Sequence, residues 1–173
     1  LLQLGDAQQA REHLEQALAL NDSHAAAQLS LGNALQALRR PGEALAHYRR
    51  AMQLEPSLAE AHGNAGITLL ALGRNEEAVA AFDDALRHRA AFPQALNNRG
   101  VALRNLARPE EALLSFDRAL QHTPEYPEAC NNRGNALRDL GQPELALESF
   151  DRALRANAGY ADALNNRGNA LLE

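Results

Sequence analysis

Asparagine recurs along the chain at a fixed interval, and its side chain is the group best suited to bind a ligand. Asn64, Asn98, Asn132 and Asn166 are each 34 residues apart. A carboxamide offers two N–H donors and one carbonyl acceptor, which match the C=O and N–H groups of an extended peptide, whatever its sequence. Asparagine inside a helix is roughly 0.5 kcal/mol less favourable than alanine. The spacing therefore predicts a ladder of amides that recognises a peptide backbone.

Further polar residues share the register of this ladder and extend it. The predicted peptide-binding residues are Asn64, Asn97, Asn98, Asn131, Asn132, Asn135, Asn165, Asn166, Arg104 and Arg138. The same expected surface carries acidic residues, namely Glu60, Glu128, Asp139 and Asp162, so its charge is mixed. A second interpretation stays open, in which an asparagine bonds a neighbouring helix or loop and spaces the stack.

Other residue types do not assemble into a reactive or metal-binding pattern. The six histidines form no His-x-x-x-His pair, and no glycine-rich phosphate loop is present, so neither a metal nor a cofactor is expected. Cys130, the single cysteine, occupies an apolar position and is expected to be a small core residue and not a nucleophile.

Composition and charge narrow the class of protein. Aromatic residues make up only 4 %, and alanine and leucine dominate the apolar set, which excludes an all-β fold. The net charge of −5 argues against a general nucleic-acid binder, which needs a basic excess. No apolar run approaches the ~18 residues of a membrane span. The single thiol makes the cytoplasm the default compartment.

Two apolar stripes recur in every 34 residues. Counting from Ala25 gives full repeats over 25–58, 59–92, 93–126 and 127–160, with partial repeats over 1–24 and 161–173. Each stripe has the period of a helix. Three of the second stripes begin at a proline, which a first helical turn tolerates; these are Pro41, Pro109 and Pro143. The pattern predicts an all-α stack in which each repeat is an antiparallel pair of helices.

Small residues within the stripes indicate close packing of the helices. Position 8 of the repeat is glycine throughout, position 20 is alanine, and position 24 is usually aromatic, as in Gly100, Ala112 and Phe116. We expect the glycine and the alanine to let two backbones approach, and the aromatic ring to fill the space beside them. A larger side chain at Gly100 should be destabilising.

This pattern, with leucine at position 11 and alanine at positions 20 and 27, resembles the tetratricopeptide repeat over nearly the whole chain. The resemblance implies a right-handed α-solenoid formed by one array over 1–173, with a concave groove lined by the first helices and a protein or peptide as partner. One departure is position 4, where the usual tryptophan is replaced by Gln28, His62, Leu96, Cys130 and Leu164.

The asparagine column is similar to the ladder in the superhelix of O-linked N-acetylglucosamine transferases, and this likeness carries a peptide-binding role to Asn64, Asn98, Asn132 and Asn166. The carboxylate-clamp repeats of chaperone adaptors instead carry lysine or arginine at positions 2, 5 and 6, which hold no basic residue here. Recognition of an acidic C-terminal peptide by such a clamp is therefore not expected.

Arginine occupies position 7 wherever the preceding repeat has aspartate at position 25. This coincidence predicts the inter-repeat pairs Asp83–Arg99, Asp117–Arg133 and Asp151–Arg167, in which a half-buried guanidinium bonds a carboxylate. The alternative is that the arginine stems extend to solvent.

Both partial repeats leave a helix without its pair. We expect ten helices, with the tail of a first helix and a second helix from about residue 7 to 20 in the opening segment, and no polar caps. This favours a fragment of a longer array whose ends stack on other copies. The main functional hypothesis is a non-catalytic scaffold that binds an extended peptide in the groove. The alternatives are the substrate-binding arm of a larger enzyme, such as an O-linked glycosyltransferase, and a self-assembling module.

Overall fold

The computed structural model describes residues 2–172, and this part of the chain is entirely helical, with no strand. Its ten helices are α1 (Leu2–Leu20), α2 (Ala25–Ala37), α3 (Pro41–Leu54), α4 (Ala59–Ala71), α5 (Asn75–His88), α6 (Pro93–Asn105), α7 (Pro109–His122), α8 (Pro127–Asp139), α9 (Pro143–Ala156) and α10 (Ala161–Ala170). None of these helices has the length and apolar character needed to cross a membrane.

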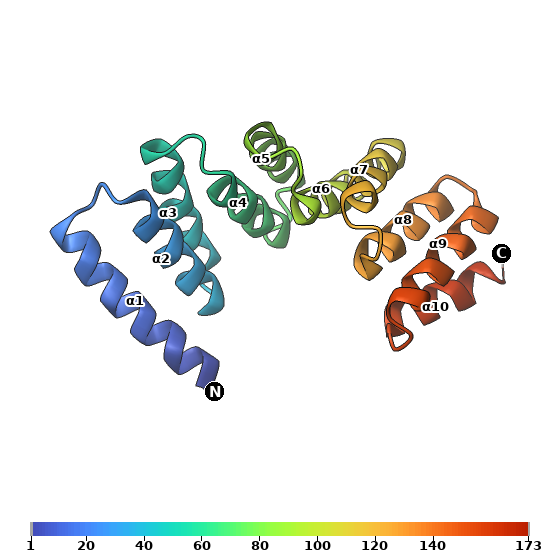
Figure 1. Cartoon of the computed structure of the whole chain (residues 1–173), viewed down its shortest axis with the longest axis horizontal. Coiled ribbons are helices and arrows are strands. Elements are labelled where there is room, and N and C mark those ends of the chain that lie inside the picture. The colour runs from blue at the N-terminus through green and yellow to red at the C-terminus, as the bar shows by residue number, and fades with distance from the viewer. Residues whose placement is uncertain (1, 173) are drawn as a thin grey trace. The chain divides into compact units, whose positions relative to one another are not determined.

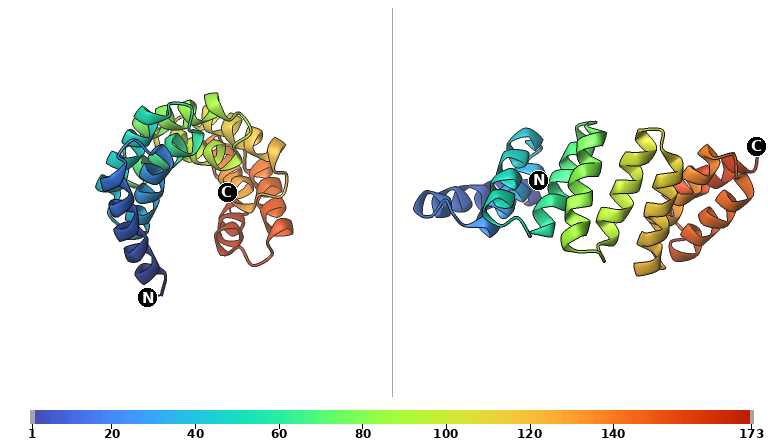
Figure 2. Two further views of the ribbon diagram at one scale, coloured as in Figure 1. Left: turned by 60° about the vertical axis from the view of Figure 1, so that its left-hand side comes forward. Right: turned by 90° about the horizontal axis from the view of Figure 1, so that it is seen from above.

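The helices form two compact units that meet in sequence at Ala90 and Ala91. In the first unit α2 packs on α3 and α4 packs on α5, while α1 lies against α2. In the second unit α6 packs on α7 and α8 on α9, and α10 follows α9. The paired helices lie side by side and antiparallel, as α8 and α9 show (Figure 1, Figure 2). The predicted helix pair is therefore confirmed, and its repetition is typical of a solenoid.

A close contact between glycine and an aromatic ring holds each complete pair together. A Cβ atom added at Gly100 would lie 2.5 Å from Cε1 of Phe116, and one added at Gly134 would lie 2.5 Å from Cε1 of Phe150. Both rings are fully buried. Glycine is thus required because the ring occupies the space that a side chain would need.

The first helix differs from the expected arrangement. The sequence pattern predicts a break before residue 7, but α1 runs without interruption from Leu2 to Leu20. In the other repeats the chain turns at a residue with positive φ, at the position that Gly5 occupies in the opening partial repeat; these residues are Arg39, Gly73, Ala107 and Gly141. Gly5 remains helical, and Ala7 stands where Pro41, Pro109 and Pro143 begin their helices. Without proline or a left-handed residue, nothing ends the helix.

Candidate peptide-binding surface

The asparagines of the second unit bond one another from repeat to repeat. Asn132 on α8 donates from Nδ2 to Oδ1 of Asn97 on α6 at 3.0 Å. Asn166 on α10 donates in the same way to Oδ1 of Asn131 on α8 at 2.9 Å. Position 6 of one repeat thus bonds position 5 of the repeat before it. Together with the equivalent residues of α2 and α4, these positions form what we call the first-helix surface of each unit.

The asparagines at positions 5 and 6 of the repeat differ in burial, although the sequence pattern predicts the same role for both. Asn97 and Asn131 expose only 5 % and 4 % of their surface. Asn132 and Asn166 are half-buried, and each uses one of its two N–H donors in the bond to its neighbour. Their remaining N–H and carbonyl groups take no partner within the described part of the chain. The outer asparagines, at position 6, are therefore the ones that a ligand can reach.

The remaining predicted groove residues of the second unit have varied surroundings. Asn98 accepts a hydrogen bond from Nδ2 of Asn97 at 3.3 Å. Asn135 is half-buried and Asn165 is exposed. Arg104 on α6 donates from Nε to Oδ2 of Asp139 on α8 at 2.5 Å, which joins the two repeats at the end of their first helices.

Arg138 lies on α8, next to Asp139 in sequence, and is half-buried. The charge of Arg104 is balanced by the carboxylate of Asp139. The first-helix surface of the second unit thus carries residues of both charges beside its asparagines.

The first unit uses a different partner for its outer asparagine. Asn64 on α4 donates from Nδ2 to Oδ1 of Asn33 on α2 at 2.7 Å, and the same oxygen accepts from the hydroxyl of Tyr48 at 2.9 Å. These residues border a hollow of about 200 Å³ whose wall also includes Ile67, a partly exposed apolar side chain. Position 5 of the preceding repeat is Leu29, which has no side-chain acceptor, and Asn33 at position 9 of that repeat accepts the bond instead.

Two of the three predicted ion pairs are present. Nε of Arg133 donates to Oδ1 of Asp117 at 2.6 Å, and Nε of Arg167 donates to Oδ1 of Asp151 at the same distance. Asp83 and Arg99 belong to different units, so that pair stays a prediction.

Sequence reasoning missed a third member of this arrangement, the serine at position 23. Nη1 of Arg133 donates to Oγ of Ser149 at 2.7 Å, and Nη1 of Arg99 donates to Oγ of Ser115 at 2.7 Å. The signal lay in the sequence, because the repeat with alanine at position 7 also has Ala81 at position 23.

Cys130 has no exposed surface and lies in the packing side of α8. Burial raises the pKa of its thiol, against the opposing effect of Arg152, Arg133 and Arg155. A buried, protonated thiol is a poor nucleophile. Among the described residues, no group of three histidine, cysteine, aspartate or glutamate side chains is placed to hold a metal ion.

A stack of antiparallel helix pairs with a polar first-helix surface defines the class of helical repeat proteins. Models of the tetratricopeptide repeat match residues 1–59, 64–128 and 127–160. The chain therefore belongs to the tetratricopeptide repeat family and is a protein-interaction scaffold of that type.

Solved structures with the same fold include several repeat proteins. YrrB, described as a TPR protein with an unusual peptide-binding site, is 28 % identical; the match covers 94 % of this chain and 84 % of YrrB with a TM-score of 0.80. MamA of Desulfovibrio magneticus RS-1 is 18 % identical over 92 % of this chain and 90 % of its own, with a TM-score of 0.83.

A third structure is the first TPR of Spaghetti (RPAP3), bound to the HSP90 peptide SRMEEVD. It is 21 % identical, and the match covers 66 % of this chain and 90 % of its own with a TM-score of 0.65. Among curated proteins, none matches the sequence significantly. The likeness to MamA and to Spaghetti shows the fold alone.

Proposed function

We propose that the chain binds an extended segment of a partner protein on its first-helix surfaces, with the outer asparagines hydrogen-bonding to the backbone of that segment. The observation that carries this proposal is the pairing of Asn132 with Asn97 and of Asn166 with Asn131. The buried asparagine fixes the outer carboxamide in one orientation, which leaves one N–H and one C=O free for a ligand. Preorganised groups lose little entropy when they bind.

This arrangement joins the two interpretations of the asparagine columns. The inner residues, Asn97 and Asn131, connect the repeats, and the outer residues, Asn132 and Asn166, face the ligand. Successive outer asparagines are one repeat apart, so a peptide that follows the surface meets the same pair of groups in each repeat. Binding that relies on backbone groups tolerates many sequences. Peptide recognition by YrrB and by Spaghetti supports a peptide as the ligand of this fold.

The proposal is tested with peptides whose backbone and side chains are varied separately. Fluorescence anisotropy measures the Kd of several labelled peptides of unrelated sequence, and of the same peptides with alternate backbone nitrogens methylated. We expect similar Kd values among the unmethylated peptides and a large loss on methylation. A Kd that follows side-chain sequence and ignores methylation would contradict the proposal.

The same assay compares the Asn132→Ala/Asn166→Ala variant with the unchanged chain. Each lost hydrogen bond is worth about 0.5–1.5 kcal/mol, so the double variant should bind roughly tenfold more weakly or worse. Gln53→Ala, which removes an exposed amide from α3, serves as a matched control and should leave Kd unchanged. Circular dichroism checks that the variants remain helical. Unchanged binding by a folded double variant would leave the asparagines with a structural role only.

The sequence resemblance of the asparagine column to that of O-linked N-acetylglucosamine transferases is the ground for a second proposal, in which the array is the substrate-binding arm of a larger enzyme. The mode of binding is the same in both cases. A catalytic domain encoded in the same reading frame would support the enzyme arm, and its absence from that reading frame would favour the scaffold.

A further inference from the structure

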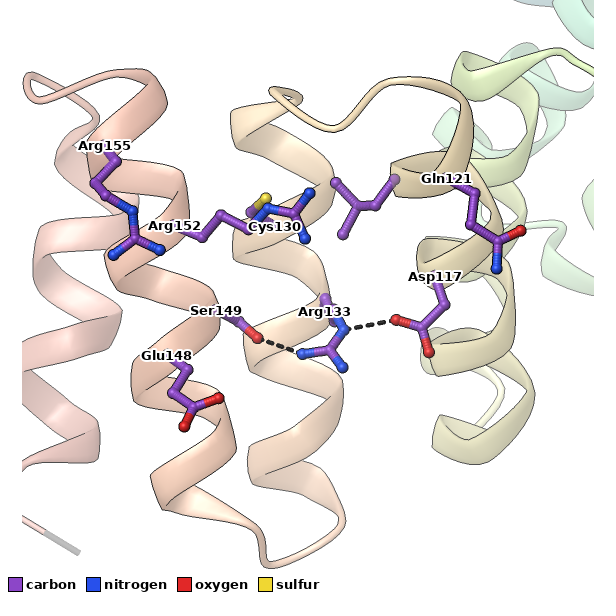
Figure 3. Close-up of a pocket in the computed structure, with 9 residues that line it drawn as sticks. Asp117, Gln121, Cys130, Arg133, Glu148, Ser149, Arg152 and Arg155 are labelled. Atoms are coloured by element: carbon purple, nitrogen blue, oxygen red, sulfur yellow. Dashed lines mark hydrogen bonds and ion pairs between the residues drawn. The ribbon is translucent and has the colours of Figure 1, made fainter.

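A hollow of the second unit lies away from the paired asparagines, and most of its lining residues belong to the second helices α7 and α9. It has a volume of about 510 Å³ and lies between α7 and α9, with α8 beneath them. Leu120 of α7 is among its lining residues. Gln121 of α7 lies on one side, and Cys130 lies on α8 between α7 and α9 (Figure 3). Arg152 and Arg155 of α9 form the opposite wall. We call this hollow the α7–α9 pocket.

Positive charge gathers at one end of the α7–α9 pocket. Arg133 is balanced by Asp117 and also bonds Ser149. Arg152 donates from Nη2 to the carbonyl oxygen of Pro124 at 2.7 Å, a neutral partner that leaves the guanidinium charge uncompensated. Arg155 takes no partner within the described part of the chain, and both arginines are exposed.

The acidic lining residues form no ion pair with these two arginines within the described part of the chain. Glu148 is one helical turn before Arg152 and about two before Arg155 on α9, but its side chain bonds neither of them, and Figure 3 shows it at the other end of the pocket. Asp117 is held by Arg133. A neighbouring hollow of about 430 Å³ shares Arg152 and Arg155, and its wall includes one acid, Glu125. The two arginines therefore stand between two hollows, with space for a carboxylate and for the chain that carries it.

The first unit provides an internal comparison, because it has a hollow in the same register. This second hollow has a volume of about 500 Å³ and lies among α3, α4 and α5. At the positions of Arg152 and Arg155 the first unit has Asp84, which lines this hollow, and Arg87, and these two side chains pair with each other. The helical repeat thus produces the hollow in both units, whereas arginine occupies both of these positions only in the repeat of α8 and α9.

We propose that Arg152 and Arg155 bind the carboxylates of an acidic segment of a partner protein, seated in the α7–α9 pocket. A guanidinium presents a planar fork of N–H donors that matches a carboxylate. An exposed ion pair is worth only about 0–1 kcal/mol, so a single carboxylate is held weakly. A segment with acidic residues on both sides of an apolar one engages both arginines and places the apolar residue in the hollow between α7 and α9. This site is independent of the asparagines and lies on the other helices of the repeat.

The test uses a fluorescein-labelled peptide in which pairs of glutamates flank a leucine, and the same peptide with glutamines in place of the glutamates. We expect the glutamate peptide to bind, and its affinity to fall as salt rises from 50 to 500 mM, because exposed charges are screened at about these ionic strengths. The glutamine peptide should not bind. Equal binding of the two peptides, or no binding of the glutamate peptide at 1 mM, would overturn the proposal.

The variants locate the site. Arg152→Gln/Arg155→Gln should raise the Kd of the glutamate peptide by about tenfold or more, since two charge-assisted hydrogen-bonding groups are lost. Arg118→Gln is the matched control, because Arg118 occupies the position of Arg152 one repeat earlier and does not line the pocket. Arg155→Gln alone removes no bond within the described chain, and it keeps the test valid if the double variant fails to fold. An unchanged Kd in Arg155→Gln would overturn the proposal.

A competition experiment separates a peptide site from a site for free anions. Citrate and inorganic phosphate are added to the complex of the chain with the glutamate peptide. Displacement only at millimolar concentrations, where ionic strength also acts, is expected for a peptide site. Displacement by micromolar citrate or phosphate would show a small-anion site and overturn the proposal in its present form.

Discussion

Asn132 and Asn97 are joined by a hydrogen bond of 3.0 Å, although they lie on different repeats and are 35 residues apart. The bond runs from the half-buried residue to the buried one, and Asn166 and Asn131 repeat it at 2.9 Å. One residue type thus serves two purposes at neighbouring positions. The inner amide connects the helices, and the outer amide faces outward with its orientation fixed.

The inner asparagines should contribute to stability in proportion to their burial. Asn131→Ala should lower the free energy of unfolding by about 1–2 kcal/mol, because it leaves the Nδ2 group of Asn166 without its acceptor. Asn165→Ala changes the same position of the next repeat, where the side chain is exposed, and should be neutral or gain a few tenths of a kcal/mol from helix propensity. Urea unfolding measures both. Equal effects of the two substitutions would show that the inter-repeat bond is not stabilising.

The glycines at position 8 differ in what surrounds them, so the same substitution should have opposite effects. Gly100→Ala would place Cβ 2.5 Å from the ring of Phe116, and overpacking of this kind costs about 1–3 kcal/mol. Gly168 has nothing within 4 Å of its Cβ position, so Gly168→Ala should raise stability by up to about 1 kcal/mol through helix propensity. Thermal unfolding of the two variants should move the Tm in opposite directions. A stabilised Gly100→Ala variant would contradict the packing argument.

The helix pairs could be predicted from sequence because the apolar stripes, the glycines and the prolines all repeat with the same period. The error at α1 arose from extending that period to Gly5, where neither proline nor a left-handed turn breaks the helix. The burial of Asn97 could not be predicted from the sequence. It depends on how closely α8 approaches α6, and no single residue determines that distance.

The pockets escaped prediction for a related reason. Leu120, Cys130 and Arg152 come from three helices, and they share a hollow only because α7 and α9 both pack against α8. The ion pairs were easier, since position 7 and position 25 change together along the chain. Their serine partner, Ser149, changes with them and was within reach of the same comparison.

Arg133 links two repeats through Asp117, and a double-mutant cycle should measure that link. Asp117→Asn and Arg133→Gln should each be mildly destabilising, with a coupling free energy of about 0.5–1 kcal/mol that decreases at high salt, since both side chains are partly exposed. Ser149→Ala tests the second bond of the guanidinium. The pair Arg74 and Glu77, three residues apart within one repeat, is the control. Because this pair does not link two repeats, removing it should leave the cooperativity of unfolding unchanged. Additive effects of Asp117→Asn and Arg133→Gln would exclude a stabilising pair.

Tyr48 should make stability fall at alkaline pH. Burial raises the pKa of its phenol to about 12, while the unfolded chain ionises near the ordinary value of about 10. The folded chain therefore keeps the proton that the unfolded chain loses, so the stabilisation is complete below pH 10 and is lost as pH rises toward 12. The loss attributable to this group reaches about 2 kcal/mol at pH 12.

Tyr48→Phe isolates this contribution, because the next three repeats carry phenylalanine at the same position, as Phe82, Phe116 and Phe150. At pH 8 the variant should be less stable by about 1 kcal/mol, since the hydroxyl loses its hydrogen bond to Asn33. Burial also raises the pKa values of Tyr126 and Tyr160, but these residues are present in both proteins and cancel in the comparison. Urea unfolding at pH 8, 10 and 11.5 should show the gap between the two proteins narrowing and then reversing as pH rises. A gap that stays constant over this range would mean that the phenol of Tyr48 titrates as it does in the unfolded chain, and that the pocket around Asn33 and Asn64 is wetter than its burial indicates.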